Sequence, residues 1–225
     1  MIFRATRSAT ITAGSHETIA KRISPVILDR RNTLRYPPPY GAGITGNRPE
    51  PFTDTRQQIM TINPIVRYPD PRLAVPAQPV MVFDGALREL ASDLLETMHA
   101  APGIGITAPH IGVSLRVVVL DLDANDDGAR TYVNPEIIWA SPEMIMHREG
   151  SVSMPGVNDD ITRHARVRIS YQDVDGNLQA EESEGLRAVC HQHEIDQLNG
   201  VFWIQRLSRL KRERLIKRFE KMSRG

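Results

Sequence analysis

A sharp change of pattern near Met60 limits how this chain can fold more than any other feature does. Before Met60 the sequence is rich in Arg, Ser and Thr, contains the proline run at positions 36–40 and shows no periodic apolar pattern. Such a segment has little apolar surface to offset the entropy of ordering a chain. We therefore predict that residues 1–59 form a disordered extension and residues 60–225 form one compact domain.

The extension allows three interpretations. The simplest is a solvated tail, or an artificial extension upstream of a true start at Met60. An organelle-targeting peptide fits the Arg-rich, acid-poor composition, although the segment has no clear amphipathic stripe. A binding arm is the third interpretation, and the sequence leaves all three open.

Composition excludes several classes of partner. The 28 basic and 27 acidic residues nearly cancel, so we expect neither nucleic acid nor an anionic membrane as a partner. The single cysteine, Cys190, excludes a disulfide within the chain and fits a reducing compartment. No apolar run reaches the roughly 18–20 residues of a membrane span. We expect a soluble, cytoplasmic monomer, or an organellar one if the extension is a targeting segment.

From Met60 onward the patterns predict helices and strands in one α+β domain. Asp84 can cap a helix that stops at Pro102-Gly103, and its apolar positions recur at helical spacing: Leu87, Leu90, Leu94, Leu95 and Met98. The β-branched run within 116–122 predicts a buried strand. Alternation over 167–171 before a turn at Asp175-Gly176 predicts a hairpin.

Two further helices are predicted toward the end of the chain. One follows Ser183 and ends at Gly200, a residue type that commonly terminates helices. The last begins near Ser208, and its expected apolar contacts are Leu210, Leu215, Ile216 and Phe219. Its many Lys and Arg residues are most simply a solvated face, and an interaction surface is the alternative.

An apparent calcium loop is rejected. Asp121, Asp123 and Asn125 have the spacing of the first three ligands, but the loop needs Gly at its sixth position and Glu at its twelfth. Those positions hold Asp126 and Tyr132. We interpret the segment as a polar loop between two strands.

The segment from His193 to Gln197 carries the strongest chemical signal. In the zinc-hydrolase pattern His-Glu-x-x-His, two imidazoles four residues apart bind one metal, and the Glu is the general base. Here Gln197 stands in place of the second His. An amide is a poorer ligand than imidazole for such a metal. Taken alone, the pattern equally fits a structural histidine.

Two other segments precede this one in order, GIGITAPHIG at 103–112 and EGSVSMPG at 149–156. Together the three closely resemble the motifs of the peptide deformylases, and the resemblance extends over Met60 to Gly225. It implies an α+β fold in which small antiparallel or mixed sheets pack around a central helix that carries the His-Glu motif. A C-terminal helix completes that fold.

The resemblance also assigns roles. In the family, one Cys and two His hold a metal, usually ferrous iron, and a Glu is the acid/base. His193 matches a metal ligand and Glu194 matches the catalytic Glu. Ser151 and Gln197 stand at the other two ligand positions, and His110 replaces the Gln that stabilises the oxyanion together with the backbone N–H after the Cys, here that of Val152. We therefore expect no metal or a weakly bound divalent one.

A peptide cleft is implied as well. Ile104 and Gly105 resemble residues whose backbone pairs with an extended peptide, and Gly150 would face that peptide from the other side. One face of the second helix would line a methionine pocket, with ordinary core packing as the alternative; its residues are Leu186, Val189, Cys190 and His193.

Four functions follow from these residues. The favoured one is a deformylase-like protein with weak or no activity that keeps a cleft for N-formyl-methionyl peptides or nascent chain N-termini. A hydrolase with a metal site rebuilt from His110 and His193 is the main alternative. The others are metal-free catalysis by Ser151 with His193 as base, which lacks the Gly-x-Ser-x-Gly elbow, and a non-catalytic interaction role.

Overall fold

The computed structural model describes residues 62–122 and 128–224. The extension at 1–59 lies outside these residues, so its prediction stays untested. The described chain contains three α-helices, seven strands and three short 3-10 helices. In chain order they are η1 (Pro71–Ala74), α1 (Gly85–Ala100), β1 (Gly105–Thr107), η2 (Ala108–Ile111), β2 (Val117–Leu120), β3 (Arg130–Ala140), β4 (Met144–Ser151), β5 (Met154–His164), β6 (Arg166–Gln172), β7 (Leu178–Glu184), α2 (Gly185–Leu198), η3 (Trp203–Arg206) and α3 (Arg209–Ser223).

The strands form two antiparallel sheets. Five strands follow the order β1-β2-β3-β6-β7, and β4 pairs with β5 in a separate hairpin. Within the described residues β1 therefore lies at an edge of the larger sheet. Gly105 pairs with Leu120 and Thr107 with Val118, so one side of β1 is bonded to β2.

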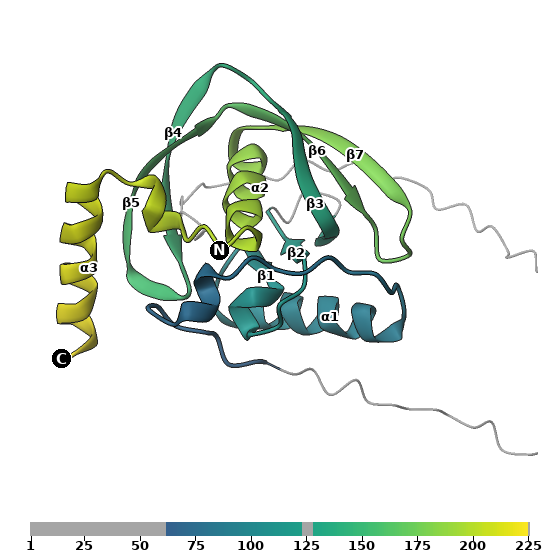
Figure 1. The fold of residues 1–225 in the computed structure, drawn as a ribbon, viewed down its shortest axis with the longest axis horizontal. Coiled ribbons are helices and arrows are strands. Elements are labelled where there is room, and N and C mark those ends of the chain that lie inside the picture. Colours follow the sequence, from purple (N-terminus) through teal and green to yellow (C-terminus); the bar gives the residue numbers. More distant parts are fainter. Residues whose placement is uncertain (1–61, 123–127, 225) are drawn as a thin grey trace, which may run out of the picture. The chain divides into compact units, whose positions relative to one another are not determined.

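Helix α2 lies between the two sheets, with the β4–β5 hairpin on one side and β3, β6 and β7 on the other (Figure 1). Eleven of its residues, Ala188 to Leu198, are buried, and these include His193, Glu194 and Gln197. Because an exposed helix buries only one stripe, burial over so much of the sequence identifies α2 as the central helix. The α+β fold with a central His-Glu helix is confirmed.

Most elements predicted from local signals are confirmed. Asp84 accepts hydrogen bonds from the backbone N–H groups of Ala86 and Leu87, and α1 ends just before Pro102-Gly103. The strand predicted in 116–122 is β2, and β6 and β7 form the predicted hairpin around Asp175-Gly176. Gly200 has a φ of +74°, as expected after a helix end.

The structure defines the start of the second helix and corrects one predicted contact of the last helix. Ser183 belongs to β7, and α2 begins after Glu184, because the strand continues up to the first residue of the helix. Leu210 was expected to be an apolar contact of the last helix, but it is 57% exposed. It lies in the first turn of α3, whereas the buried contact of that helix, Leu215, lies one turn later.

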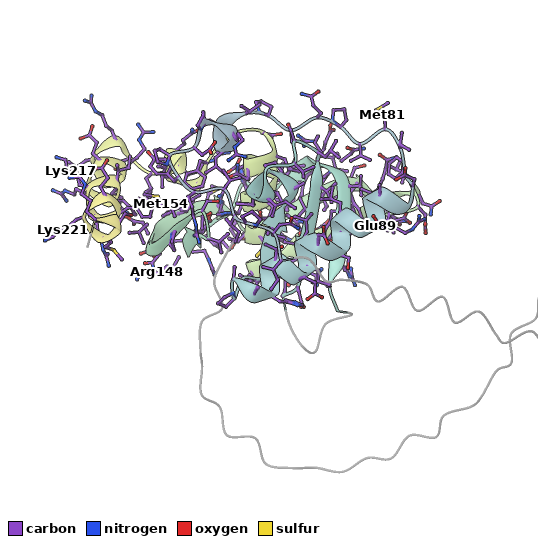
Figure 2. All side chains as sticks on the ribbon, turned by 90° about the horizontal axis from the view of Figure 1, so that it is seen from below. Met81, Glu89, Arg148, Met154, Lys217 and Lys221 are labelled. Atoms are coloured by element: carbon purple, nitrogen blue, oxygen red, sulfur yellow. The ribbon has the colours of Figure 1, made fainter. Side chains whose placement is uncertain are left out.

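Helix α3 packs on β5 through a narrow apolar face. Leu215 is buried, and Ile216 and Phe219 pack beside it against the cluster that contains Trp203. Lys217 and Lys221 project away from the rest of the domain (Figure 2). Among the described residues no helix is long and apolar enough to cross a membrane.

Candidate functional site

The carboxylate of Glu194 lies directly against strand β1. A Cβ atom added to Gly105 would lie 2.8 Å from Glu194 Oε1 and 2.8 Å from a methyl group of Leu120. Such distances are too short for a real side chain, so only glycine lets the carboxylate approach the strand this closely. The structure thus brings the predicted acid/base together with Gly105.

His193 is oriented by a buried carboxylate. Its Nδ1 lies 2.8 Å from Glu149 Oε2, and both side chains are buried. Glu149 is clamped by the guanidinium of Arg163, which donates from Nε and Nη2 over 2.9 Å each. A carboxylate held in this way accepts a hydrogen bond from Nδ1–H, which fixes the tautomer of the imidazole and leaves its lone pair on Nε2.

The same clamp keeps Glu149 ionised. Burial by itself raises the pKa of this carboxyl, but hydrogen bonds from Arg163 and His193 outweigh it and lower the pKa to about 2. A charged, bidentate pair of this kind is strong and geometrically specific. His193 therefore lies against an ionised carboxylate near neutral pH.

Arg163 has a second buried partner in Asp196, three residues beyond His193. Asp196 also accepts from Arg206, whose Nε donates over 2.8 Å. No role was predicted from the sequence for Glu149, Arg163 or Asp196. Only Glu149 had a signal that could have indicated it, because it stands beside Gly150 within a segment already identified by its resemblance.

His110 offers a donor at the site. The backbone N–H of Thr107 donates to His110 Nδ1 over 3.1 Å, and the Thr107 hydroxyl lies 2.8 Å from the same nitrogen. Because Nδ1 accepts, the neutral ring carries its proton on Nε2. Burial lowers the pKa of His110 to about 3, so the ring is neutral near pH 7. Nε2 is buried and has no hydrogen-bond partner among the described residues.

Ser151 and Gln197 both make local structural bonds. Ser151 Oγ accepts from the backbone N–H of Ser153 over 3.1 Å. The Gln197 amide nitrogen donates to the carbonyl oxygen of Leu73 over 2.9 Å. In residues 62–122 and 128–224, no group of three or more His, Cys, Asp and Glu side chains is placed to hold a metal ion.

Most of the predicted cleft residues are buried, and Leu186 is the exception. Ile104, Val189 and Cys190 belong to one buried apolar cluster, and burial raises the pKa of the Cys190 thiol. Val152 is buried in a second cluster, and Gly150 is buried in β4. Leu186 is different, because 39% of it is exposed. Core packing therefore describes Val189 and Cys190 but not Leu186.

Comparisons with known proteins relate this chain to one family. The family model described as polypeptide deformylase matches residues 62–213. A protein of Bradyrhizobium diazoefficiens named peptide deformylase-like is 81% identical over 74% of this chain and 97% of its own length. A peptide deformylase of Methylocella silvestris is 47% identical over 72% of this chain and 85% of its own length.

A solved structure is also similar to this chain. The crystal structure of a peptide deformylase from Legionella pneumophila superposes with a TM-score of 0.69 at 38% identity, covering 73% of this chain and 96% of that one. The family model spans well over half of the chain, and the relatives are covered almost completely. This chain belongs to the polypeptide deformylase family.

Proposed function

We propose that this protein binds the N-terminus of N-formyl-methionyl peptides or nascent chains and removes the formyl group weakly or not at all. Its family carries out that reaction with a metal ion. The proposal keeps the peptide cleft and assigns the loss of activity to the metal site.

The bonds of Gln197 and Ser151 carry this proposal. Gln197 directs its amide at Leu73 O, and Ser151 is a neutral hydroxyl that accepts from Ser153. A serine hydroxyl supplies neither the negative charge nor the soft donor of a thiolate. These residues do not fit a three-ligand metal site, and without a metal a water molecule keeps a high pKa in front of Glu194.

The surroundings of His110 support retention of the cleft. Its Nε2–H is a buried donor without a partner among residues 62–122 and 128–224, and an unsatisfied donor of this kind is costly unless a ligand supplies the acceptor. The formyl oxygen is such an acceptor. Strand β1, at the sheet edge, presents a backbone to which an extended peptide can add.

The tautomer of His110 argues against a rebuilt metal site. A histidine binds a metal through a deprotonated nitrogen. Here Nδ1 is occupied by the N–H of Thr107, and Nε2 carries the proton. Using His110 as a ligand would require Nε2 to lose that proton, and therefore a rearrangement at Thr107.

Calorimetric titration of the full chain tests the cleft. We expect formyl-Met-Ala-Ser to bind saturably and Met-Ala-Ser to bind at least about tenfold more weakly, because only the formyl group offers the acceptor. Equal affinity for the two peptides, or no binding of either, would overturn the proposed retention of the cleft.

A further inference from the structure

A cavity of about 230 Å³ opens beside the Arg163–Asp196 ion pair. Its apolar wall contains Ile137, Ala140 and Met144, and its polar floor contains Arg163, Asp196 and Arg206. None of the residues that line it was predicted to bind peptide or metal, although Asp196 stands within the His193–Gln197 segment. It is smaller than the roughly 300–1,000 Å³ of sites for drug-sized ligands, so an occupant has few heavy atoms.

The floor of the cavity offers a donor. Both oxygens of Asp196 already accept, from Arg163 and from Arg206. Arg206 uses Nε and Nη2 in those bonds, and its Nη1 makes no hydrogen bond to any described residue. Nearly half of the Arg206 side chain is exposed, so the guanidinium can reach a ligand without losing Asp196.

Gln192 also lines the cavity, and both ends of its side-chain amide are engaged in hydrogen bonds. Its oxygen accepts from the backbone N–H of His164, and its nitrogen donates to the carbonyl oxygens of His164 and Ala188. These bonds hold the Gln192 side chain in place and leave the ligand the remaining polar groups of the lining. Arg206 supplies the cationic group with a remaining donor, and Thr162 and His164 are the other polar residues of the lining.

The apolar part of the lining is partly exposed. Ile137 and Met144 are 38% and 46% exposed, although both are large aliphatic side chains. Covering them with an alkyl chain removes apolar surface from water, which is favourable by about 25 cal/mol per Å². A ligand that satisfies both sides has an anionic head and a short aliphatic tail.

We propose that this cavity is a binding site for a small aliphatic carboxylate. The carboxylate accepts from Arg206, and a tail of roughly four to six carbons covers Ile137, Ala140 and Met144. The site is independent of the proposed peptide binding. It lies one ion pair away from the Glu149–His193 contact, because Arg163 contacts both Asp196 and Glu149.

Calorimetric titration of the full chain with isovalerate at pH 7 tests the proposal, with isovaleramide as the uncharged analogue of the same shape. We expect saturable binding of isovalerate and binding of the amide at least about tenfold weaker, because a hydrogen bond to a charged group is lost. No saturable binding of isovalerate, or equal binding of the two compounds, would overturn the site.

Two variants locate the binding. Met144→Glu places a negative charge on the apolar wall, and we expect isovalerate affinity to fall about tenfold or more. Met146→Glu is the matched control, because Met146 is exposed on the same strand and does not line the cavity. Arg206→Gln should weaken binding to a similar extent. If Met144→Glu binds as tightly as Met146→Glu, the ligand lies elsewhere and the proposal fails.

Discussion

The side-chain amide of Gln197 donates a hydrogen bond to the backbone carbonyl of Leu73 over 2.9 Å, and both residues are buried. This contact joins the central helix α2 to η1, 124 residues earlier in the chain. Gln197, which the sequence resemblance aligns with a metal-ligand position, thus fastens two elements of the fold.

Removing this contact should destabilise the domain. Gln197→Leu keeps the approximate volume but leaves the Leu73 carbonyl without its donor, which costs about 1–3 kcal/mol. Urea unfolding measures the change in the free energy of unfolding. Gln205→Leu, at an exposed position, is the control and should change it by less than about 0.5 kcal/mol. Equal effects of the two substitutions would show that the Gln197 bond contributes nothing.

The close approach of Glu194 to β1 predicts a severe effect of Gly105→Ala. The added methyl group would overlap Glu194 Oε1 and Leu120, so we expect a loss of about 1–3 kcal/mol and reduced peptide affinity. Gly85→Ala is the matched control, because its Cβ would meet no atom within 4 Å. Thermal unfolding of both variants checks the prediction, and similar melting temperatures would contradict the geometry.

The clamp on Glu149 predicts a specific dependence of stability on pH. Its folded-state pKa of about 2 lies below the usual 4.5, so its contribution is complete above about pH 4.5 and is lost as pH falls through 2. The shift corresponds to roughly 3 kcal/mol. Unfolding free energies between pH 6 and pH 2.5 should therefore fall less steeply in Glu149→Gln than in the natural protein.

The exposed pair of Arg168 with Glu182 supplies the control for that comparison, since exposed pairs contribute little. Glu182→Gln should keep the pH profile of the natural protein. An unchanged profile in Glu149→Gln would mean that the clamp does not stabilise the ionised carboxyl.

His110 should decide how well the cleft distinguishes formylated from free N-termini. His110→Leu removes the Nε2–H donor, and we expect affinity for formyl-Met-Ala-Ser to fall about tenfold while that for Met-Ala-Ser changes little. His110→Gln restores an N–H donor and should recover most of the difference. Equal loss for both peptides in His110→Leu would indicate a packing defect instead.

Local sequence signals predicted the helices well and the long strands poorly. Asp84 and the Leu spacing identified α1, because a cap and a helical period are properties of nearby residues. Strand β3 was missed: its C-terminal half is exposed, Asn134 has a positive φ and its pairing with β6 shifts register twice. Such bulges interrupt the alternation by which strands are recognised.

The site was predictable only in part for a similar reason. His193 and Glu194 stand in a short motif with a known helical spacing. Glu149 contacts His193 across 44 residues and Arg163 contacts Asp196 across 33, so nothing local in the sequence pairs them. The tautomer of His110 likewise depends on Thr107, whose N–H is aimed by the turn into η2.

The most direct test is hydrolysis of a formyl-methionyl peptide by anaerobically purified protein supplied with ferrous iron, nickel or zinc. A Ser151→Cys/Gln197→His variant, which restores both family ligands, is assayed beside it. We predict weak or no turnover by the natural protein and much faster turnover by the double variant, since a metal-bound water would then face Glu194. Turnover by the natural protein that is as fast as that of the double variant, and that Glu194→Ala abolishes, would contradict the proposed loss of the metal site.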